Sequence, residues 1–582
     1  MGLSLGFNNV KVDQSGRVSV AGARSGLDWH ELVDKMVAAK SIPIDMISRK
    51  ITADGEQLVA LNDIQSKAGA LKSVLSQLYG EHTYDSGKDI FEKKAGVTST
   101  ITPGSPSTDL LGASAKNSAK VGQYEVEITE VALAHKIHSK IIPFGVGAAA
   151  GLAGAMVLQD PVTLIDKATI NILPTDNLLT VVDKINNSAS DVMASVISID
   201  ATHSKIVLQS KKTGENFAIQ FSPSSTQALV EDSGLGFATF SGTYTVDHEV
   251  DPPQNAMFSV DGVPIIRQSN VITDVVQDVT FQVLKKEPGT KVKVSIERDV
   301  SAIRSQVEKF VAAYNDLLVE ANTQAHRDPN ASTQKPLYNT TFIRGLKSQL
   351  GRFVTVTPLG SSGVKTLQDV GIVANTGLGA MNGDYRTIGQ LSIDQNKMDQ
   401  AIVGDIESFR RFFVLDFVSS DAEVALSKFK PSIMPLSGSA GVFNINTNGV
   451  NIINSTFNEG SVTTTPTTVE VTSGPAKGLI LSYTGPTNKM GVQISYTIGA
   501  AVQMMGIMDN LLNEATGLIT QNIKMAQSAQ SAAQKSKDQK LLLIEQYRQR
   551  LLKQNQRMEQ KVSESRAIMD NIEAMFKKND NN

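Results

Sequence analysis

The chain has 582 residues, a formal net charge of -3 and no cysteine. A chain of this length has room for roughly three or four domains. The near-neutral charge gives no electrostatic reason to expect a nucleic acid or a membrane surface as a partner. The lack of cysteine excludes disulfide bonds, thiolate metal sites and cysteine nucleophiles.

Residues 1–24 show no strong period and are expected to form a flexible tail. They lack a basic region followed by a long apolar run, so we expect no cleaved secretory signal. The protein is then either cytoplasmic or exported by a route that needs no such signal.

A helical pattern begins after Asp28, which can serve as an N-cap. Its first apolar face comprises Trp29, Leu32, Val33, Met36 and Val37. Pro43 is expected to interrupt the helix. The spacing resumes with Ile44, Ile47, Ile51, Leu58 and Leu61 and then, after a shift of phase, with Ile64, Ala68, Leu71, Leu75 and Leu78.

Strand-like alternation replaces helical spacing after Tyr79, as in Tyr124, Val126 and Ile128. We expect a β head domain in residues 85–137 and 255–300. Between these halves, a helix is predicted at 178–187 and strands at 192–199 and 205–210. Residues 138–254 are therefore expected to form a nested α/β subdomain.

Helical spacing returns at Ser301 with Ile303, Val307, Phe310 and Tyr314. Further helices are predicted at 342–354 and 395–413, with a strand at 389–393, which together make a helical middle domain at 301–430. Residues 431–499 are rich in serine, threonine, asparagine and glycine and are expected to form a β-rich insertion. Within it, 478–487 and 492–498 are predicted to pair as a hairpin.

The C-terminal stretch is expected to be helical from Ala500, with interruptions at Gly506 and Gly517. Leu541 to Phe576 contains neither glycine nor proline and is predicted to be one long helix. With Ile544 at heptad position a, the a and d positions are Ile544, Tyr547, Leu551, Gln554, Met558, Lys561, Ser565, Ile568, Ile572 and Met575. This repeat needs a partner helix, and the N-terminal segment is the natural one.

The expected fold class is therefore α+β and multidomain. Two terminal α-helical coiled-coil legs, 25–84 and 500–582, accompany the helical middle domain and the mainly-β head domains. The polar residues Gln554, Lys561 and Ser565 weaken the seam of the C-terminal leg. We hypothesise that they keep the contacts of the leg exchangeable.

A search for catalytic chemistry yields no convincing site. Gly2 to Gly6 matches G-x-S-x-G, but it lies at the chain terminus, without the strand and helix that a nucleophile elbow needs. His135 and His138 have no third ligand nearby and are expected to be solvated. Neither a P-loop nor a dinucleotide fingerprint is present. We expect no enzyme activity, no catalytic residue, no cofactor and no metal.

Seven segments together resemble one known family. They are 25–44, 121–137, 178–214, 258–281, 297–318, 367–372 and 389–402, and FSVDGVPIIRQSNVITDVVQDVTF (Phe258 to Phe281) is the most specific of them. In this order they are similar to the bacterial flagellar filament cap family, also called hook-associated protein 2. The segment 431–499 departs from the family pattern.

The resemblance implies an extracellular protein, exported through the flagellar type III channel, that promotes flagellin polymerisation at the filament tip and prevents the loss of exported flagellin. It also implies a ring-shaped homo-oligomer of about five subunits. Further implied partners are flagellin, hook-associated junction proteins and an export chaperone at the C-terminus. No nucleic acid or membrane partner is implied.

The residues expected to carry assembly contacts lie on the two coiled-coil seams. They are Leu27, Asp28, Trp29, Leu32, Met36, Ile44, Ile47, Ile51, Leu58, Ile544, Tyr547, Leu551, Met558, Ile568, Ile572 and Met575. Two alternatives remain open: a protein of the hook-filament junction or another axial structure, and a surface adhesin that acts through the β head. A secreted hydrolase is the reading that the sequence favours least.

Overall fold

The structure of the protein is a computed structural model. It describes residues 10–12, 18–20, 29–79, 89–102, 104–359, 364–375, 384–429, 440–474 and 476–579. The chain divides into two units, which are described separately. Unit 1 combines Met1–His82 with Gln306–Asn582, and unit 2 is Thr83–Ser305. The expected α+β class is confirmed.

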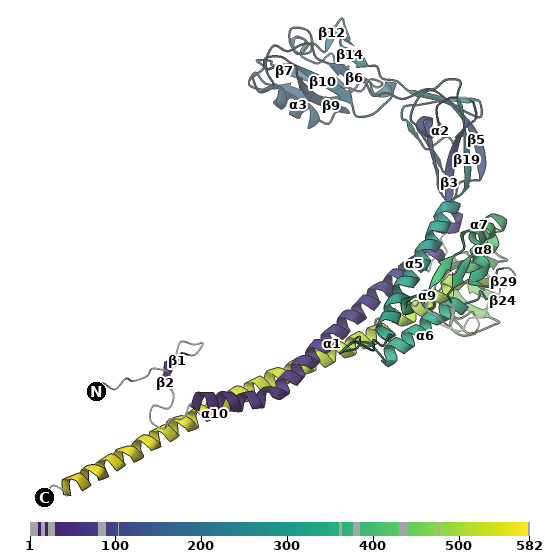
Figure 1. The fold of residues 1–582 in the computed structure, drawn as a ribbon. Coiled ribbons are helices and arrows are strands. Elements are labelled where there is room, and N and C mark those ends of the chain that lie inside the picture. Colours follow the sequence, from purple (N-terminus) through teal and green to yellow (C-terminus); the bar gives the residue numbers. More distant parts are fainter. Residues whose placement is uncertain are drawn as a thin grey trace. The chain divides into compact units, whose positions relative to one another are not determined.

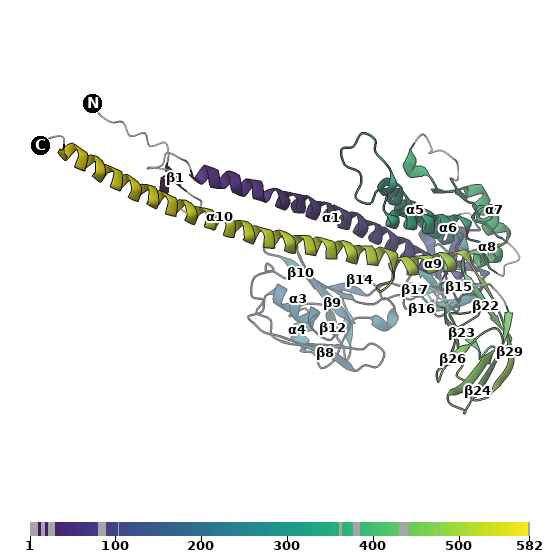
Figure 2. The same ribbon diagram turned by 90° about the horizontal axis from the view of Figure 1, so that it is seen from below.

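Unit 1 contains a long two-helix leg. Helix α1 (Trp29–Tyr79) has 51 residues and α10 (Leu518–Asn579) has 62. They lie side by side and antiparallel (Figures 1 and 2). Asp34 near the start of α1 pairs with Arg548, whereas Gly55 further along α1 lies against Gln530. The two ends of the chain are therefore joined by a long-range helical contact.

The burial of apolar side chains explains why α1 is held against the rest of unit 1. Leu61, Ile64, Ala68, Leu71 and Leu75 are each 0% exposed. They repeat at steps of three and four, which puts them on one side of the helix. One apolar seam of α1 is thus fully enclosed by the rest of unit 1.

Pro43 does not interrupt α1, contrary to expectation. Proline cannot donate the amide hydrogen bond to the carbonyl four residues earlier. Pro43 lies on the exposed side of α1, where water can hydrate the freed carbonyl of Ala39. The nearby Ser41 hydroxyl also donates to the Ala38 carbonyl over 2.8 Å. The helix therefore continues through the proline.

The middle of unit 1 surrounds helix α9 (Ala500–Leu512). Every residue from Ala500 to Met508 is buried, including Gly506, so the expected interruption at Gly506 is absent. The chain instead breaks between α9 and α10, at residues 513–517. The other elements are α5 (Val300–Ala325), α6 (Thr341–Thr355), β20 (Ile372–Ala374), β21 (Leu391–Ile393), α7 (Gln395–Gly404) and α8 (Ile406–Phe413), with short 3-10 turns η3 (Leu367–Val370) and η4 (Tyr385–Thr387).

The single helix predicted at 395–413 is two helices. Asp405 has an extended backbone, with φ -153° and ψ 86°, and its side chain accepts a hydrogen bond from the Ser408 amide. It caps α8, so α7 must end there. Sequence periodicity alone does not reveal this break, because apolar residues continue on both sides.

The described residues between α8 and α9, 415–429, 440–474 and 476–498, form a β lobe. Its strands are β22 (Leu415–Ser419), β23 (Ala425–Phe429), β24 (Ala440–Thr447), β25 (Ile452–Phe457), β26 (Val462–Thr464), β27 (Thr468–Val471), β28 (Leu479–Ser482) and β29 (Lys489–Ile498). They make two four-stranded sheets, β22-β29-β24-β25 and β23-β28-β27-β26. The hairpin predicted from β28 and β29 is wrong. The two strands bury apolar residues in different sheets, and the connection between them crosses from one sheet to the other.

Unit 2 begins and ends with a β head. A five-stranded sheet, β16-β15-β5-β19-β3, and a three-stranded sheet, β17-β18-β4, share one apolar core. The strands are β3 (Lys94–Thr100), β4 (Leu111–Ala115), β5 (Gly122–Glu130), β15 (Ala256–Val260), β16 (Val263–Arg267), β17 (Val271–Ile272), β18 (Val279–Val283) and β19 (Lys291–Arg298). Asp261 and Gly262 turn β15 into β16 with φ of 51° and 80°. Such positive angles favour these two residue types in a hairpin.

The residues between β5 and β15 in the sequence form a second hydrophobic core. Its sheets are β14-β6-β10-β9, β11-β7-β8 and β12-β13. The elements are β6 (Lys136–His138), β7 (Gly154–Gln159), β8 (Asp166–Ile172), α3 (Leu178–Asn186), β9 (Val192–Ser198), β10 (Ser204–Ser210), β11 (Gln220–Phe221), α4 (Gln227–Val230), β12 (Ala238–Phe240), β13 (Tyr244–Val246) and β14 (Glu249–Asp251). The domain boundaries proposed from the sequence, at 138 and 254, remain predictions.

Replacing Leu71 by alanine tests the α1 seam. Because Leu71 is 0% exposed, the variant Leu71→Ala should lose about 2 to 5 kcal/mol of unfolding free energy. The matched variant on the same helix is Leu32→Ala, whose side chain is 47% exposed and which should lose less than about 1 kcal/mol. Urea unfolding followed by far-ultraviolet circular dichroism gives both values. Equal losses would contradict the burial described for Leu71.

Candidate assembly surface

The residues predicted for assembly fall into two groups in the structure. The first group lies in the contact between α1 and α10. Ile44 is 7% exposed, and Ile47, Ile51 and Leu58 are half-buried. On α10, Ile544, Tyr547 and Leu551 are half-buried as well. All of these residues are at least half-buried in the leg, but Ile51 and Leu58 lie level with earlier turns of α10 than Ile544 to Leu551.

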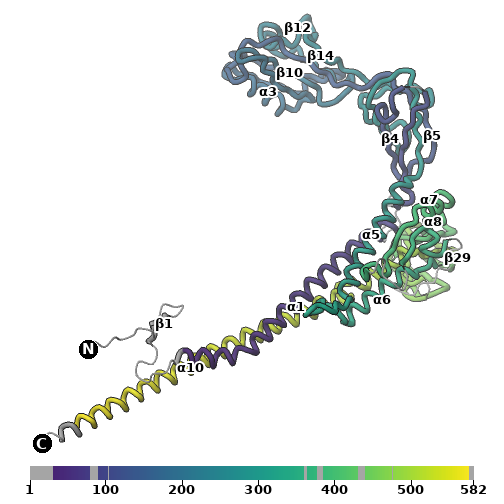
Figure 3. Tube along the Cα trace, in the orientation of Figure 1, coloured from purple at the N-terminus to yellow at the C-terminus, as the bar shows by residue number. Residues whose placement is uncertain are grey.

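The second group has no partner helix among the described residues. Exposed fractions are 47% for Met558, 59% for Ile568, 46% for Ile572 and 73% for Met575. The reason is length: α1 begins at Trp29, while α10 continues past that point (Figure 3). The periodic pattern predicts a uniform apolar seam along α10. Among the described residues, only part of that seam has a partner helix.

The start of α1 also differs from the expectation. Leu32 is 47% exposed and Met36 is 39% exposed, so neither side chain is enclosed. Val33, one residue along from Leu32, is 1% exposed. Leu27 and Asp28 lie outside the described residues, and only the backbone of Trp29 is described.

Polar contacts mark the level at which the two helices meet. The Asp34 carboxylate accepts a 2.8 Å hydrogen bond from Arg548, and the Lys40 ammonium lies 5.8 Å from the centre of the Tyr547 ring. Both ion-pair partners are exposed, so the pair itself adds little stability. Sequence reasoning missed these contacts because charged pairs on exposed helices carry no periodic signal.

Sequence reasoning also missed a set of exposed apolar residues in the middle of the leg. Ile42 and Met46 on α1 are 59% and 66% exposed. Leu541, Leu542 and Leu543 on α10 are 46%, 61% and 62% exposed. A run of three leucines in a helix that is paired on one side only is the signal that could have found them.

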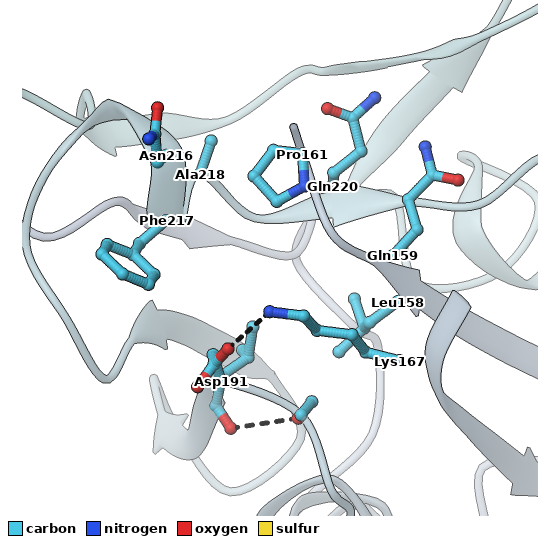
Figure 4. A pocket seen from close by; sticks show the side chains of 11 residues that line it. Leu158, Gln159, Pro161, Lys167, Asp191, Asn216, Phe217, Ala218 and Gln220 are labelled. Carbon is cyan, nitrogen blue, oxygen red and sulfur yellow. Dashed lines mark hydrogen bonds and ion pairs between the residues drawn. The ribbon is translucent and has the colours of Figure 1, made fainter. Parts of the chain in front are cut away.

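A small cavity in unit 2 is lined in part by charged side chains that pair with one another. It holds about 20 Å³, room for about one water molecule. The Lys167 ammonium points at Asp191, 2.7 Å away, and also lies 2.9 Å from Asp160 (Figure 4). The hydrogen bond from Lys167 lowers the pKa of the Asp191 carboxyl. These charges satisfy one another, which favours a structural role.

An open groove lies on the β lobe. It has a volume of about 370 Å³ and is lined by residues that include Val418, Ser420, Val442, Gln493 and Ser495. All of its lining residues are uncharged. Among the described residues, its lining offers no acid pair of the kind that hydrolysis uses.

The two histidines considered as metal ligands lie in different surroundings, since the half-buried His138 ring stacks on His248 with 5.1 Å between ring centres, whereas His135 is enclosed. His135 is 3% exposed, so the expectation that it is solvated is wrong. Its Nδ1 accepts a 2.7 Å hydrogen bond from the Ile219 amide, and its Nε2 lies 3.1 Å from the Glu249 carboxylate. Burial lowers the pKa of His135, against the opposing effect of Glu249. Among the described residues, no group of three potential ligands could hold a metal ion.

A search of the described helices for a membrane span was negative, since none combines sufficient length with sufficient apolar character.

Comparison with known proteins shows which family this chain matches. Residues 253–567 match the family model described as flagellar hook-associated protein 2 C-terminus, which alone covers more than half of the 582 residues. Residues 25–135 match the model of the N-terminus of the same family. The chain belongs to the flagellar hook-associated protein 2 family. The resemblance inferred from the sequence is thereby confirmed, as is the filament cap function at the level of the family.

Individual relatives carry the same description. The B-type flagellar hook-associated protein 2 of Pseudomonas aeruginosa is 25% identical over 413 residues, which cover 67% of this chain and 79% of that protein. Flagellar hook-associated protein 2 of Escherichia coli is 26% identical over 402 residues, which cover 67% and 81%. A crystal structure of the D1-D2-D3 domains of the Escherichia coli flagellar cap protein FliD is 22% identical with a TM-score of 0.42, covering 62% of this chain and 90% of that one.

Replacing His135 tests its buried neutral state. A lowered folded-state pKa means that the unfolded chain takes up a proton near pH 6.5 while the folded chain does not. Stability should then fall as the pH drops below about 6.5, and His135→Gln should reduce that loss. Thermal unfolding midpoints at pH 8 and pH 5.5 measure the effect. His203→Gln, at an exposed histidine, is the control, and an unchanged pH dependence in His135→Gln would contradict the assignment.

Proposed function

We propose that this flagellar filament cap protein acts as a homo-oligomer at the distal, extracellular end of the filament. There it promotes flagellin polymerisation and prevents the loss of exported flagellin. The observation that supports this most is the leg itself: two long helices from the two ends of the chain that leave large apolar side chains uncovered along their length.

The uncovered side chains explain why assembly would be favourable. Burying apolar surface is worth about 25 cal/mol per Å². Exposed residues on both helices, such as Met46 and Leu542, would gain this free energy in contact with another molecule. A cap made of several copies supplies such contacts, and so does the growing end of the filament.

The same leg suits export as a loosely structured chain. Distal α10 has no partner helix among the described residues, and an isolated helix with one apolar seam is marginally stable in water. A chain without cysteine also has no disulfide to open. We infer that the leg is loosely paired before assembly and becomes ordered at the tip.

The proposed partners follow from this role. They are flagellin, other copies of this chain in a ring of about five subunits, hook-associated junction proteins and an export chaperone at the C-terminus. The proposed role needs no catalytic residue, metal or cofactor. Exposed seam residues from Met558 to Met575 are the proposed contacts for the distal leg.

Deleting the gene tests the cap function. Without a cap, exported flagellin should be lost, so we expect unpolymerised flagellin in the culture supernatant and short or missing filaments. Immunoblotting of the supernatant and electron microscopy of cells measure both, with the full chain supplied in trans as the control. Normal filaments, with the protein located along the shaft or at the hook junction, would support the alternative axial role instead.

Replacing the polar seam residues tests whether leg contacts must stay exchangeable. Gln554, Lys561 and Ser565 are exposed on α10, at positions where leucine would make a continuous apolar seam. The triple leucine variant should bind its neighbours too firmly and give shorter filaments and reduced swimming. The control replaces the exposed off-seam residues Lys553, Gln560 and Glu564 by leucine. Unchanged motility in the seam variant would refute the idea.

A further inference from the structure

Two groups of exposed apolar side chains lie at the same height on the leg. We call Ile42 and Met46 the α1 patch and Leu541, Leu542 and Leu543 the α10 patch. Because Asp34 meets Arg548 and Gly55 meets Gln530, interpolation along the antiparallel pair puts Ile42 level with Leu541 to Leu543. The two helices therefore expose apolar surface at one level.

The two patches face away from each other within one leg. Ile44 and Ile544 belong to the contact between the helices. A residue two positions away from either points about 200° around the helix axis. Ile42, Met46 and Leu542 accordingly lie on the far faces of their helices and are 59%, 66% and 61% exposed.

We propose that the α1 patch of one copy packs against the α10 patch of the next copy, the two copies being related by a rotation about an axis parallel to the leg. This inference rests on the self-assembly proposed above. A rotation without translation brings together only surfaces at the same height. Contact between two different patches is heterologous, and it can close into a ring.

Charges of both signs border the patches, including Arg49 and Lys50 on α1 and Asp538 and Glu545 on α10, and one pair next to the patches in sequence has opposite charge. Asp45 adjoins Met46 in the α1 patch, and Lys540 adjoins Leu541 in the α10 patch. Neither makes an ion pair with another residue in the part of the chain that the structure describes. In the proposed contact the carboxylate and the ammonium lie at about the same height, so their attraction favours this register over a shifted one.

The test uses the full chain with the two substitutions Ile42→Cys and Leu542→Cys. The natural chain has no cysteine, so no other thiol competes. Within one leg the two positions face opposite directions, which prevents an internal disulfide. Oxidation with copper phenanthroline should therefore link copies head to tail. We expect a ladder of covalent oligomers on a denaturing gel, ending at the closed ring and collapsing with reductant.

The control chain carries Glu56→Cys with Leu542→Cys. Glu56 is exposed on the same helix but lies two heptads, about 21 Å, further along. This control should give no ladder. An equal ladder in the control, or a product that stops at the dimer, would overturn the proposed contact.

Light scattering of the unoxidised sample separates the two proposals. An oligomer that fails to form the ladder overturns this contact but leaves self-assembly in place. A monomer at every concentration tested overturns self-assembly as well. The flagellin leakage of the deletion strain is a separate readout, which decides the cap function independently of either result.

Discussion

Unit 1 depends on the burial of one apolar seam of α1 against the C-terminal helices. Leu61, Ile64 and Leu71 have no solvent exposure, and α9 is buried on every side from Ala500 to Met508. Lys72 on α1 pairs with Asp509 on α9 over 2.8 Å, which adds a polar contact at the edge of the seam. Because the seam joins the two ends of the chain, everything between them is inserted into a helical pair. Apolar burial at this density is the largest stabilising contribution available to a helix pair.

The burial of the apolar seam decreases along the leg, and this decrease determines how the leg can assemble. Near α9 it is fully buried, at Ile47, Ile51 and Ile544 it is half-buried, and from Met558 onward it faces no helix among the described residues. Stability therefore decreases toward the far end of α10. The least stable part of a structure is the part most easily reordered when a partner binds. A leg of this kind can be loose in a single copy and ordered in an assembly.

The β regions are held in place by a different kind of contact. Their irregular segments are fixed by side chains that bind backbone groups. Asn186 accepts from the Ala194 amide over 2.8 Å and donates to its carbonyl over 2.9 Å, which satisfies part of the free edge of β9. In the middle of unit 1, Asn315 binds both backbone groups of Leu391 in the same way. Such bonds protect strand edges and position loops without adding apolar surface.

The sequence by itself determined the features that depend on local periodicity. The heptads of α1 and α10, the alternation in β5 and β19, and the Asp261-Gly262 turn all follow from residue order, because each reflects which side of an element is apolar. The composition also excluded cysteine chemistry. The family resemblance identified the chain from its motifs, and the matching family models confirmed it.

Only the tertiary structure decided where those patterns find partners. Periodicity predicted an apolar seam as far as Met575, but the length of α1 determines that its pairing ends near Leu551. Strands β28 and β29 look like a hairpin locally, yet pairing with distant strands places them in different sheets. The exposure of Ile42 and Leu542 likewise depends on which face of each helix is covered. Contacts between residues far apart in the chain are set by global packing, and a local pattern carries no information about them.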